Sequence, residues 1–247
     1  MTSVIRQLQE QDILFETNVS LKTKTWIKTG GVTALWITPS SVEKLVEAIH
    51  ILQSEKVKFE LVGHTSNVYY LDSYNPTAIV STILLKQFEE EDGYIICACG
   101  TPVTSLSRYC VEKGYVGYYG LVNLPGTVGA AICNNSSCFD CSVSEHLIEA
   151  TFYDLDKADI IVLKPQDLGF TFRSSKLKRQ EIKGVLLSIK LDKRQGDIEE
   201  EQSKAAEATI VRKKTQESPA YTLGSVYAGL IPRNNIPNKL ASGGASY

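Results

Sequence analysis

Apolar residues recur at helical spacing in one early segment, residues 39–56, with the sequence PSSVEKLVEAIHILQSEK. The side chains that fall on one face of this helix are Val42, Leu45, Val46, Ile49 and Leu52. Ser40 and Glu43 stand three residues apart at its start, which is the spacing of a capping box. We therefore expect an amphipathic helix that begins at this serine.

A second helix is predicted over residues 101–114, TPVTSLSRYCVEKG. Thr101 is placed to cap it, Pro102 fits its first turn, and Gly114 is a typical stop residue. A third segment, residues 197–216, is polar and rich in helix-forming residues, with its acidic residues early and its basic residues late. The acidic runs 89–92 and 199–201 are interpreted as solvated turns or helix faces rather than metal ligands.

Short apolar or alternating runs, bounded by turn residues, predict strands in the rest of the chain. They are VKFELVG (57–63), NVYYLD (67–72), AIVST (78–82), a hairpin in FEEEDGYIICACG (88–100), LIEATFYDL (147–155), ADIIVLK (158–164) and GVLLSIKLDK (184–193). The hairpin is expected to turn at Asp92 and Gly93. Few helical segments separate the later strands, so the predicted class is α+β.

Composition and charge narrow the functional classes. The chain has 247 residues, of which 43% are hydrophobic and 22% charged, which suits one large or two small globular domains. A formal net charge of −2, with basic residues spread along the chain, argues against a nucleic-acid partner. The start lacks the apolar core of a signal peptide, and no apolar run reaches the roughly 20 residues of a membrane span. We expect a cytoplasmic protein without a membrane partner.

Three of the six cysteines are clustered. Cys133, Cys138 and Cys141 show the opening spacing of a plant-type iron–sulfur site, and His146 follows closely. No fourth cysteine follows Cys141, and a single C-x-x-C pair is weak evidence for zinc. The preferred interpretation is three free thiols and no metal site.

Two loops of small and polar residues are the candidate binding elements. Residues 63–67, GHTSN, separate two predicted strands, and residues 125–131, PGTVGAA, combine a rigid turn with side chains small enough for a ligand to approach the backbone. Free N–H groups at a turn or helix start bind anions without any cationic side chain. The two loops together suit the two phosphates of a dinucleotide, although each taken alone also fits a plain turn. Neither loop is a Rossmann fingerprint or a P-loop.

Five motifs occur in an order that resembles the UDP-N-acetylenolpyruvoylglucosamine reductase family of peptidoglycan precursor flavoenzymes. They are TGG (29–31), LVGHTSNVYYLD (61–72), LPGTVGAA (124–131), FTFRSSKLK (170–178) and LGSVYAG (223–229). The resemblance extends from about Asn18 to Gly229. It implies a two-lobed FAD-binding domain of the vanillyl-alcohol-oxidase type over residues 1–195, with lobes of about 1–78 and 79–195. Residues 196–247 would be a reduced substrate-binding domain.

The resemblance also implies site residues. FAD would be bound by Gly63, His64, Thr65, Ser66, Asn67, Pro125, Gly126, Thr127, Gly129, Ala130, Ala131 and Asn135. NADPH would be the co-substrate and a nucleotide sugar the substrate. Arg173 matches the arginine that binds the substrate carboxylate and stabilises enolate charge, and Ser225 matches the serine that protonates the substrate carbanion after hydride transfer.

Several positions depart from the family pattern. No Asp or Glu follows Glu217, where the family has a third catalytic residue, a glutamate. Ala228 and Gly229 stand where the family has a lysine and an asparagine for the phosphates of the nucleotide sugar. His64 and Thr65 in the first loop, and Ala130 in the second, replace glycines. These departures leave two alternatives open: a flavin oxidoreductase of the same fold with another substrate, and an FAD-binding protein without turnover.

Overall fold

The computed structural model describes residues 1–216 and 222–223. Its helices are α1 (Thr2–Glu10), α2 (Val42–Ser54), α3 (Val103–Glu112), α4 (Val128–Asn134) and α5 (Ile198–Thr215), with 3-10 turns η1 (Leu21–Thr23), η2 (Tyr119–Leu121) and η3 (Val143–His146). Its strands are β1 (Phe15–Ser20), β2 (Val32–Ile37), β3 (Phe59–Val62), β4 (Ala78–Ser81), β5 (Phe88–Glu91), β6 (Tyr94–Ala98), β7 (Ser137–Cys138), β8 (Cys141–Ser142), β9 (Leu147–Asp154), β10 (Asp159–Leu163) and β11 (Gly184–Asp192). No helix in the described ranges is long and apolar enough to cross a membrane.

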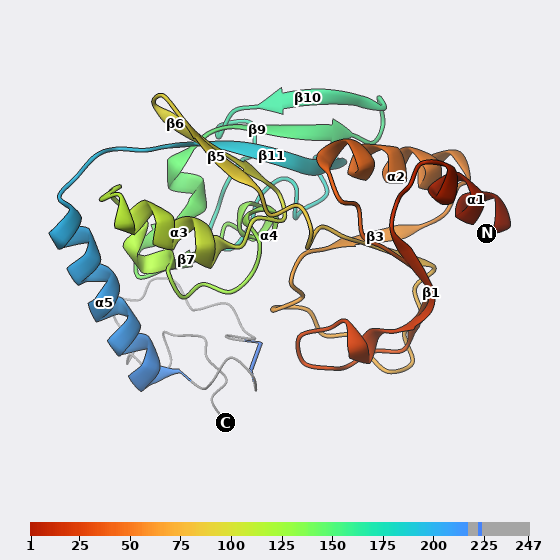
Figure 1. The fold of residues 1–247 in the computed structure, drawn as a ribbon, viewed down its shortest axis with the longest axis horizontal. Helices are drawn as coiled ribbons and strands as arrows, with labels where there is room; N and C mark the ends of the chain where they lie inside the picture. Colours follow the sequence, from red (N-terminus) through yellow and green to blue (C-terminus); the bar gives the residue numbers. More distant parts are fainter. Residues whose placement is uncertain (217–221, 224–247) are drawn as a thin grey trace.

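The strands form two main sheets (Figure 1). The first has the order β1-β2-β4-β3, with β1 antiparallel to β2 and the other pairs parallel. The second has the order β10-β9-β11-β6-β5 and is antiparallel throughout. Because β4 lies between β2 and β3, the first sheet continues to Ser81, three residues past the lobe boundary expected at residue 78.

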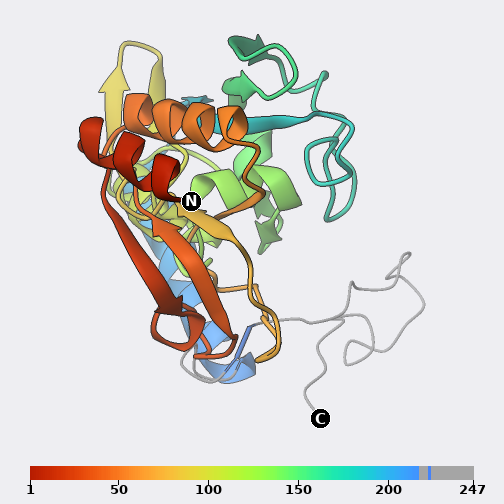
Figure 2. The ribbon, with the colours of Figure 1, turned by 90° about the vertical axis from the view of Figure 1, so that its right-hand side faces the viewer.

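Successive side chains in the first sheet point to opposite faces, as the two-residue period of a strand requires, and they pack into two different clusters. Leu35 and Ile37 of β2 belong to the main core, together with Leu45 and Ile49 of α2. Trp36, between them, packs instead into a smaller cluster on the opposite face. Helices α1 and α2 lie side by side along the first face (Figure 2).

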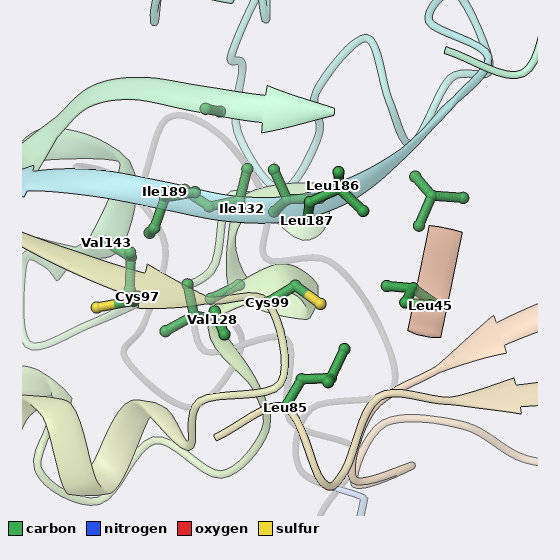
Figure 3. Close-up of a cluster of buried hydrophobic side chains, with 14 of the residues drawn as sticks. Leu45, Leu85, Cys97, Cys99, Val128, Ile132, Val143, Leu186, Leu187 and Ile189 are labelled. Atoms are coloured by element: carbon green, nitrogen blue, oxygen red, sulfur yellow. The ribbon is translucent and has the colours of Figure 1, made fainter. Parts of the chain in front are cut away.

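The main core is continuous across both sheets. In the second sheet, Cys97 of β6 and Ile189 of β11 are cross-strand neighbours, and they belong to the same cluster as Val128 and Ile132 of α4. Figure 3 shows these side chains gathered together, with Leu45 of α2 at one side of the group. This shared core therefore joins the helix of the first sheet to the second sheet and to α4.

Most of the predicted elements are confirmed, with shifts at their ends. Helix α2 is capped by Ser41, whose Oγ accepts from the Lys44 N–H at 3.2 Å, so the predicted capping box at Ser40 is wrong by one residue. Helix α3 has Pro102 at its N-cap, one residue after the predicted Thr101. Gly114 follows the last turn of α3 with φ of +75°, as expected of a stop residue.

The predicted strand at residues 67–72 is wrong, because no strand forms there. Tyr70 is buried in the smaller cluster, and its hydroxyl donates to Glu60 at 2.8 Å. Tyr69 and Leu71, on either side, are 61% and 60% exposed. The segment alternates as a strand does, but its backbone pairs with no neighbouring strand.

Helix α5 has the predicted charge order, but it is not solvated along its whole acidic end. Asp197 caps it, and its last turn carries the basic residues. Glu201 is only 2% exposed: it accepts from the Gly117 N–H at 3.3 Å and pairs with Lys204 at 3.0 Å. The expectation that 199–201 is a solvated run is therefore wrong at Glu201. Helix α5 packs against η2 and α3, and the contacts of Glu201 stabilise this packing.

We expect Glu201→Ala to destabilise the protein by about 1–3 kcal/mol, because it removes a buried carboxylate and leaves the half-buried Gly117 N–H without its acceptor. The measurement is the midpoint of urea unfolding. Glu200→Ala is the matched control: its carboxylate also pairs with Lys204, at 2.7 Å, but its side chain is 63% exposed. We expect that control to change stability by less than about 0.5 kcal/mol. Equal losses in the two variants would contradict a special role for the buried carboxylate.

Candidate functional site

The two loops identified in the sequence meet in space, although about 60 residues separate them. A Cβ placed on Gly63 would lie 2.5 Å from the Thr127 Oγ1 atom, so the loops are in direct contact. A Cβ on Gly126 would lie 3.5 Å from the Ser66 Oγ atom. Together the loops surround a small cavity of about 70 Å³. Its lining residues are Gly63, His64, Thr65, Ser66, Asn67, Leu124, Pro125, Gly126, Thr127, Ala130, Ala131, Asn134 and Ser136.

Each loop is positioned by a regular element. Residues 63–67 follow β3, whose last carbonyl, of Val62, accepts from the Thr82 N–H at 2.9 Å. Residues 125–127 precede α4, and Thr127 caps that helix by accepting from the Ala130 N–H at 3.3 Å. The cavity therefore lies where the first sheet ends and α4 begins.

The free backbone donors differ from those expected at the helix start. The N–H groups of Val128 and Gly129 donate to the carbonyls of Thr101 and Cys99, both at 2.8 Å, and Ala130 donates to Thr127. In contrast, the N–H groups of residues 66–67 and 126–127 meet no acceptor within the described part of the chain. The donors available to an anion thus come from the two loops rather than from α4.

Thr65 has a structural role in its loop. Its φ is +53°, a left-handed conformation that is uncommon for a β-branched residue. Its Oγ1 accepts from the Trp26 N–H at 2.9 Å and donates to the His64 carbonyl at 2.7 Å. These bonds hold the strained turn and attach it to the segment after η1, so the hydroxyl itself is already engaged.

His64 is the one titratable side chain among the described residues that line the small cavity. It is half-buried, and burial lowers the pKa of its imidazole. His64 also lines a second cavity of about 560 Å³, together with Lys24 and Glu16, which pair with each other at 2.5 Å. The charges of Lys24 and Glu16 in the second cavity therefore compensate each other beside His64.

Asn135 is placed differently from expectation. It ends α4 with φ of +45°, its Nδ2 donates to the Thr171 carbonyl at 2.8 Å, and its Oδ1 accepts from Ser144 at 2.5 Å. Its neighbours Asn134 and Ser136 line the small cavity instead. The side chain of Asn135 thus links loops of the protein, and no local pattern in the sequence favours its neighbours over it.

Arg173 lies in a tight turn attached to the far end of α4. Thr171 and Ser174 exchange two backbone hydrogen bonds, at 3.0 and 3.1 Å, and Arg173 between them has φ of +56°. Besides the bond from Asn135 to Thr171, Ser175 Oγ donates to the Cys133 carbonyl at 2.7 Å. One short helix therefore carries the second loop at its start and the arginine turn at its end. Ser225 lies outside the described residues.

A larger cavity of about 780 Å³ adjoins the small one and shares Gly63, Thr127, Ala130 and Asn134 with it. Its walls come from β3 on one side and from β11 and the segment around Leu177 on the other. The apolar side chains that line it are Val57, Phe59, Leu61, Val62, Leu155, Leu177, Val185 and Leu186. A volume and a lining of this kind suit a flat aromatic ring system. Sequence reasoning missed these residues because each of them has the pattern of an ordinary core position.

The clustered cysteines do not converge on His146 as metal ligands. His146 is buried, its Nδ1 lies 2.8 Å from the Asp192 Oδ1 atom, and its ring stacks on Tyr118. Within residues 1–216 and 222–223, no group of three or more His, Cys, Asp or Glu side chains is arranged to hold a metal ion.

Two solved structures illustrate which proteins share this architecture. A UDP-N-acetylenolpyruvylglucosamine reductase from Thermus caldophilus superimposes with a TM-score of 0.71 at 20% identity, over 88% of this chain and 75% of that one. A glucooligosaccharide oxidase from Acremonium strictum superimposes with a TM-score of 0.57 at 14% identity, over 78% and 43% of the two chains. The predicted α+β class and the two-lobed FAD fold of the vanillyl-alcohol-oxidase type are confirmed.

Sequence relatives agree with the predicted resemblance. UDP-N-acetylenolpyruvoylglucosamine reductase of Caldicellulosiruptor saccharolyticus is 27% identical over 235 residues, covering 95% of this chain and 75% of the relative. The enzyme of the same name from Bacillus subtilis is 27% identical over 240 residues, covering 96% and 77%. The family described as FAD binding domain matches residues 33–163, just over half of the 247-residue chain and including both loops. The chain therefore belongs to the family of FAD-binding domains.

Proposed function

We propose that the protein is an FAD-dependent reductase that uses NADPH to reduce the enolpyruvyl group of UDP-N-acetylglucosamine enolpyruvate, a step of peptidoglycan precursor synthesis. The observation that carries the proposal is the convergence of two distant loops on one cavity, with an arginine turn fastened to the far end of the same helix. The names of the relatives support the substrate.

The residues of the small cavity fit a pyrophosphate. The loops offer free backbone donors, and the Cβ positions of Gly63 and Gly126 show how closely the two backbones approach. The apolar walls of the larger cavity fit a ring system of the cofactor. When bound, FAD supplies hydride chemistry that no protein side chain provides.

The roles of the protein residues follow from their chemistry. Arg173 carries a planar guanidinium that binds a carboxylate with two parallel hydrogen bonds, and its turn is held to α4 by Asn135 and Ser175. We propose that it binds the carboxylate of the enolpyruvyl group and stabilises the charge that develops there. Ser225 would donate the proton that completes reduction of the double bond.

The domain arrangement and the cellular setting belong to the same proposal. The two sheets and their helices would form the two lobes of the FAD-binding domain, and residues from about 196 would contribute to the substrate side. The substrate would be a small nucleotide sugar, with no nucleic acid or membrane as partner. A cytoplasmic location agrees with NADPH and a UDP-sugar as substrates.

A stoichiometric assay tests the proposal. FAD-loaded protein should oxidise one equivalent of NADPH for each equivalent of the enolpyruvyl UDP-sugar. Omitting the sugar should leave only slow NADPH oxidation by oxygen. FAD binding without sugar-dependent NADPH oxidation would overturn the proposed activity and leave the cofactor assignment intact.

A second candidate is a flavin oxidoreductase of the same fold that acts on another substrate. It is favoured by Ala228 and Gly229, which remove a cation and an amide from positions where the resembled family contacts nucleotide-sugar phosphates. Reduction of the bound flavin by NADPH, with no response to the enolpyruvyl UDP-sugar, would support this candidate. An FAD-binding protein without turnover would show neither response.

We expect FAD affinity to fall as pH rises, because of His64. Burial lowers the pKa of His64 in the free protein, so the imidazole is neutral near pH 7. A bound pyrophosphate dianion favours the imidazolium form and raises that pKa, so binding takes up a proton. Affinity should then weaken by up to ~10-fold per pH unit as pH rises through the interval between the two pKa values.

Quenching of FAD fluorescence between about pH 5 and pH 8 measures this effect. His64→Gln should flatten the dependence, whereas His50→Gln, on the exposed face of α2, should leave it unchanged. Calorimetry in buffers of different ionisation enthalpy should count the proton directly. The same pH dependence in His64→Gln and in the wild type would contradict the role of His64.

A further inference from the structure

A short hairpin places two cysteines opposite each other. Strands β7 and β8 pair antiparallel with Cys138 in register with Cys141, and the turn between them consists of Phe139 and Asp140. Both turn residues are left-handed, with φ of +49° and +58°, which is the pattern of a two-residue type I′ hairpin. Paired residues in such a ladder have Cα atoms about 5.5 Å apart, within the 4.4–6.8 Å range of disulfides.

The two thiols differ in accessibility and in surroundings. Cys138 is half-buried and its Sγ accepts from the Arg212 Nη1 atom at 3.2 Å, whereas Cys141 is only 3% exposed. Burial raises the pKa of both thiols, and at Cys138 the guanidinium groups of Arg212 and Arg173 oppose that effect. Cys138 is thus the more accessible thiol of the pair and the one that lies beside positive charge, which favours its thiolate.

The remaining cysteines lack one or both of these features. Cys97, Cys99 and Cys110 are buried in the main core, and burial raises the pKa of each. Cys133 is half-buried, but it lies on helix α4 and therefore has no cross-strand partner. A thiol that is inaccessible, or that has no cysteine opposite it, forms no intramolecular disulfide without a change of structure.

We propose that Cys138 and Cys141 are a reversible dithiol–disulfide couple that exchanges with low-molecular-weight disulfides. The Cys138 thiolate attacks one sulfur of the small disulfide, forming a mixed disulfide and releasing one small thiol. The Cys141 thiolate then attacks the Cys138 sulfur and releases the second small thiol. Two protein thiols are oxidised to one disulfide, one small disulfide is reduced to two thiols, and the two cysteine protons leave on those thiols.

The position of the hairpin connects this couple to the candidate site. Oxidation prevents the Cys138 sulfur from becoming a thiolate, the strongest acceptor it can offer to Arg212, which lies in the last turn of α5. The hairpin also follows directly on Asn135, which is bonded to the turn that carries Arg173. The proposal that the two cysteines form a redox couple rests on the hairpin geometry and does not depend on the proposed reductase activity.

The experiment is a redox titration of the full-length protein in buffers of glutathione and glutathione disulfide. After acid quenching, free thiols are alkylated and the peptide that contains both cysteines is identified by mass spectrometry. At the most oxidising glutathione ratios, we expect this peptide to carry no alkyl groups on the two cysteines and to be lighter by two hydrogen atoms. Treatment with dithiothreitol should restore both alkylation sites. A peptide with two alkylatable thiols at every ratio would overturn the proposal.

Variants test the order of attack. Cys141→Ser should trap a stable glutathione adduct on Cys138, whereas Cys138→Ser should leave Cys141 largely unreacted because it is buried. Cys133→Ser is the matched control and should titrate as the wild type does. Arg212→Gln should slow oxidation, and Arg212→Lys should restore part of the rate. An adduct that forms equally on Cys133 and Cys138 would show general thiol reactivity and would also overturn the couple.

Discussion

Gly63→Val is expected to weaken FAD binding by at least about 100-fold, which corresponds to about 2.7 kcal/mol. A Cβ on Gly63 would lie 2.5 Å from the Thr127 Oγ1 atom and 2.8 Å from its Cγ2 atom, so valine must push the two loops apart. The residues of the two loops that carry free N–H groups would then no longer line one cavity. Equilibrium dialysis of the purified apoprotein with FAD measures the loss.

Two further variants separate this effect from general damage. Gly93→Asn introduces a side chain at the β5–β6 turn, where a Cβ meets nothing within 4 Å and φ of +85° suits asparagine, and it should bind FAD as the wild type does. Thr127→Ala combined with Gly63→Val removes the two closest atoms and should recover part of the affinity. Wild-type affinity in Gly63→Val would remove the loops from the cofactor site. Gly126 is a poorer position for this test, because its φ of +117° makes any side chain strained there.

The sequence predicted the elements of the fold wherever periodicity and stop signals agreed. The helix at α2, the hairpin at Asp92 and Gly93, and the strands β9, β10 and β11 all stand where the pattern placed them. The failures have local causes. Ser40 and Ser41 are equally good caps by type, and only the backbone conformation selects Ser41. Residues 67–72 alternate like a strand, but strand formation also needs a partner with free backbone groups.

Burial of a single charged residue is the kind of feature that periodicity does not reveal. Glu201 belongs to a run of three glutamates, and helix geometry alone sends their side chains in different directions. The docking of α5 onto η2 selects Glu201 to face Gly117. The sequence carries no local mark of that choice, because the partner is 84 residues away.

The two loops of the candidate site could be predicted from the sequence, whereas the apolar residues that line the larger cavity could not. Glycines and small residues flanked by strand or helix signals indicate close backbone approach, and the structure brings the two loops together. The apolar walls of the larger cavity come from separate segments, none with a chemical signature. The role of α4 as a rigid link to the arginine turn depends on the hydrogen bonds from Asn135 and Ser175, which only the folded chain reveals.

Ser225→Ala should separate proton donation from binding. If its hydroxyl protonates the substrate carbanion, reduction of the flavin by NADPH should stay nearly unchanged, because that step takes no proton from this residue. Reduction of the enolpyruvyl UDP-sugar by the prereduced protein should slow by about 10²- to 10⁴-fold, the usual range for a positioned acid. Stopped-flow absorbance of the flavin follows the two half-reactions separately.

The serine hydroxyl is a weak acid in water, so its proposed role would depend on contact with a strongly basic carbanion that Arg173 holds in place. Ser225→Ala should therefore leave the affinity for the sugar nearly unchanged, whereas Arg173→Ala should weaken that affinity, since the guanidinium is the group proposed to bind the carboxylate. Ser54→Ala, at the end of α2 and away from both loops, serves as the control and should change neither half-reaction. Equal slowing of both half-reactions in Ser225→Ala, or no slowing at all, would make Ser225 a structural residue and remove the proposed proton donor.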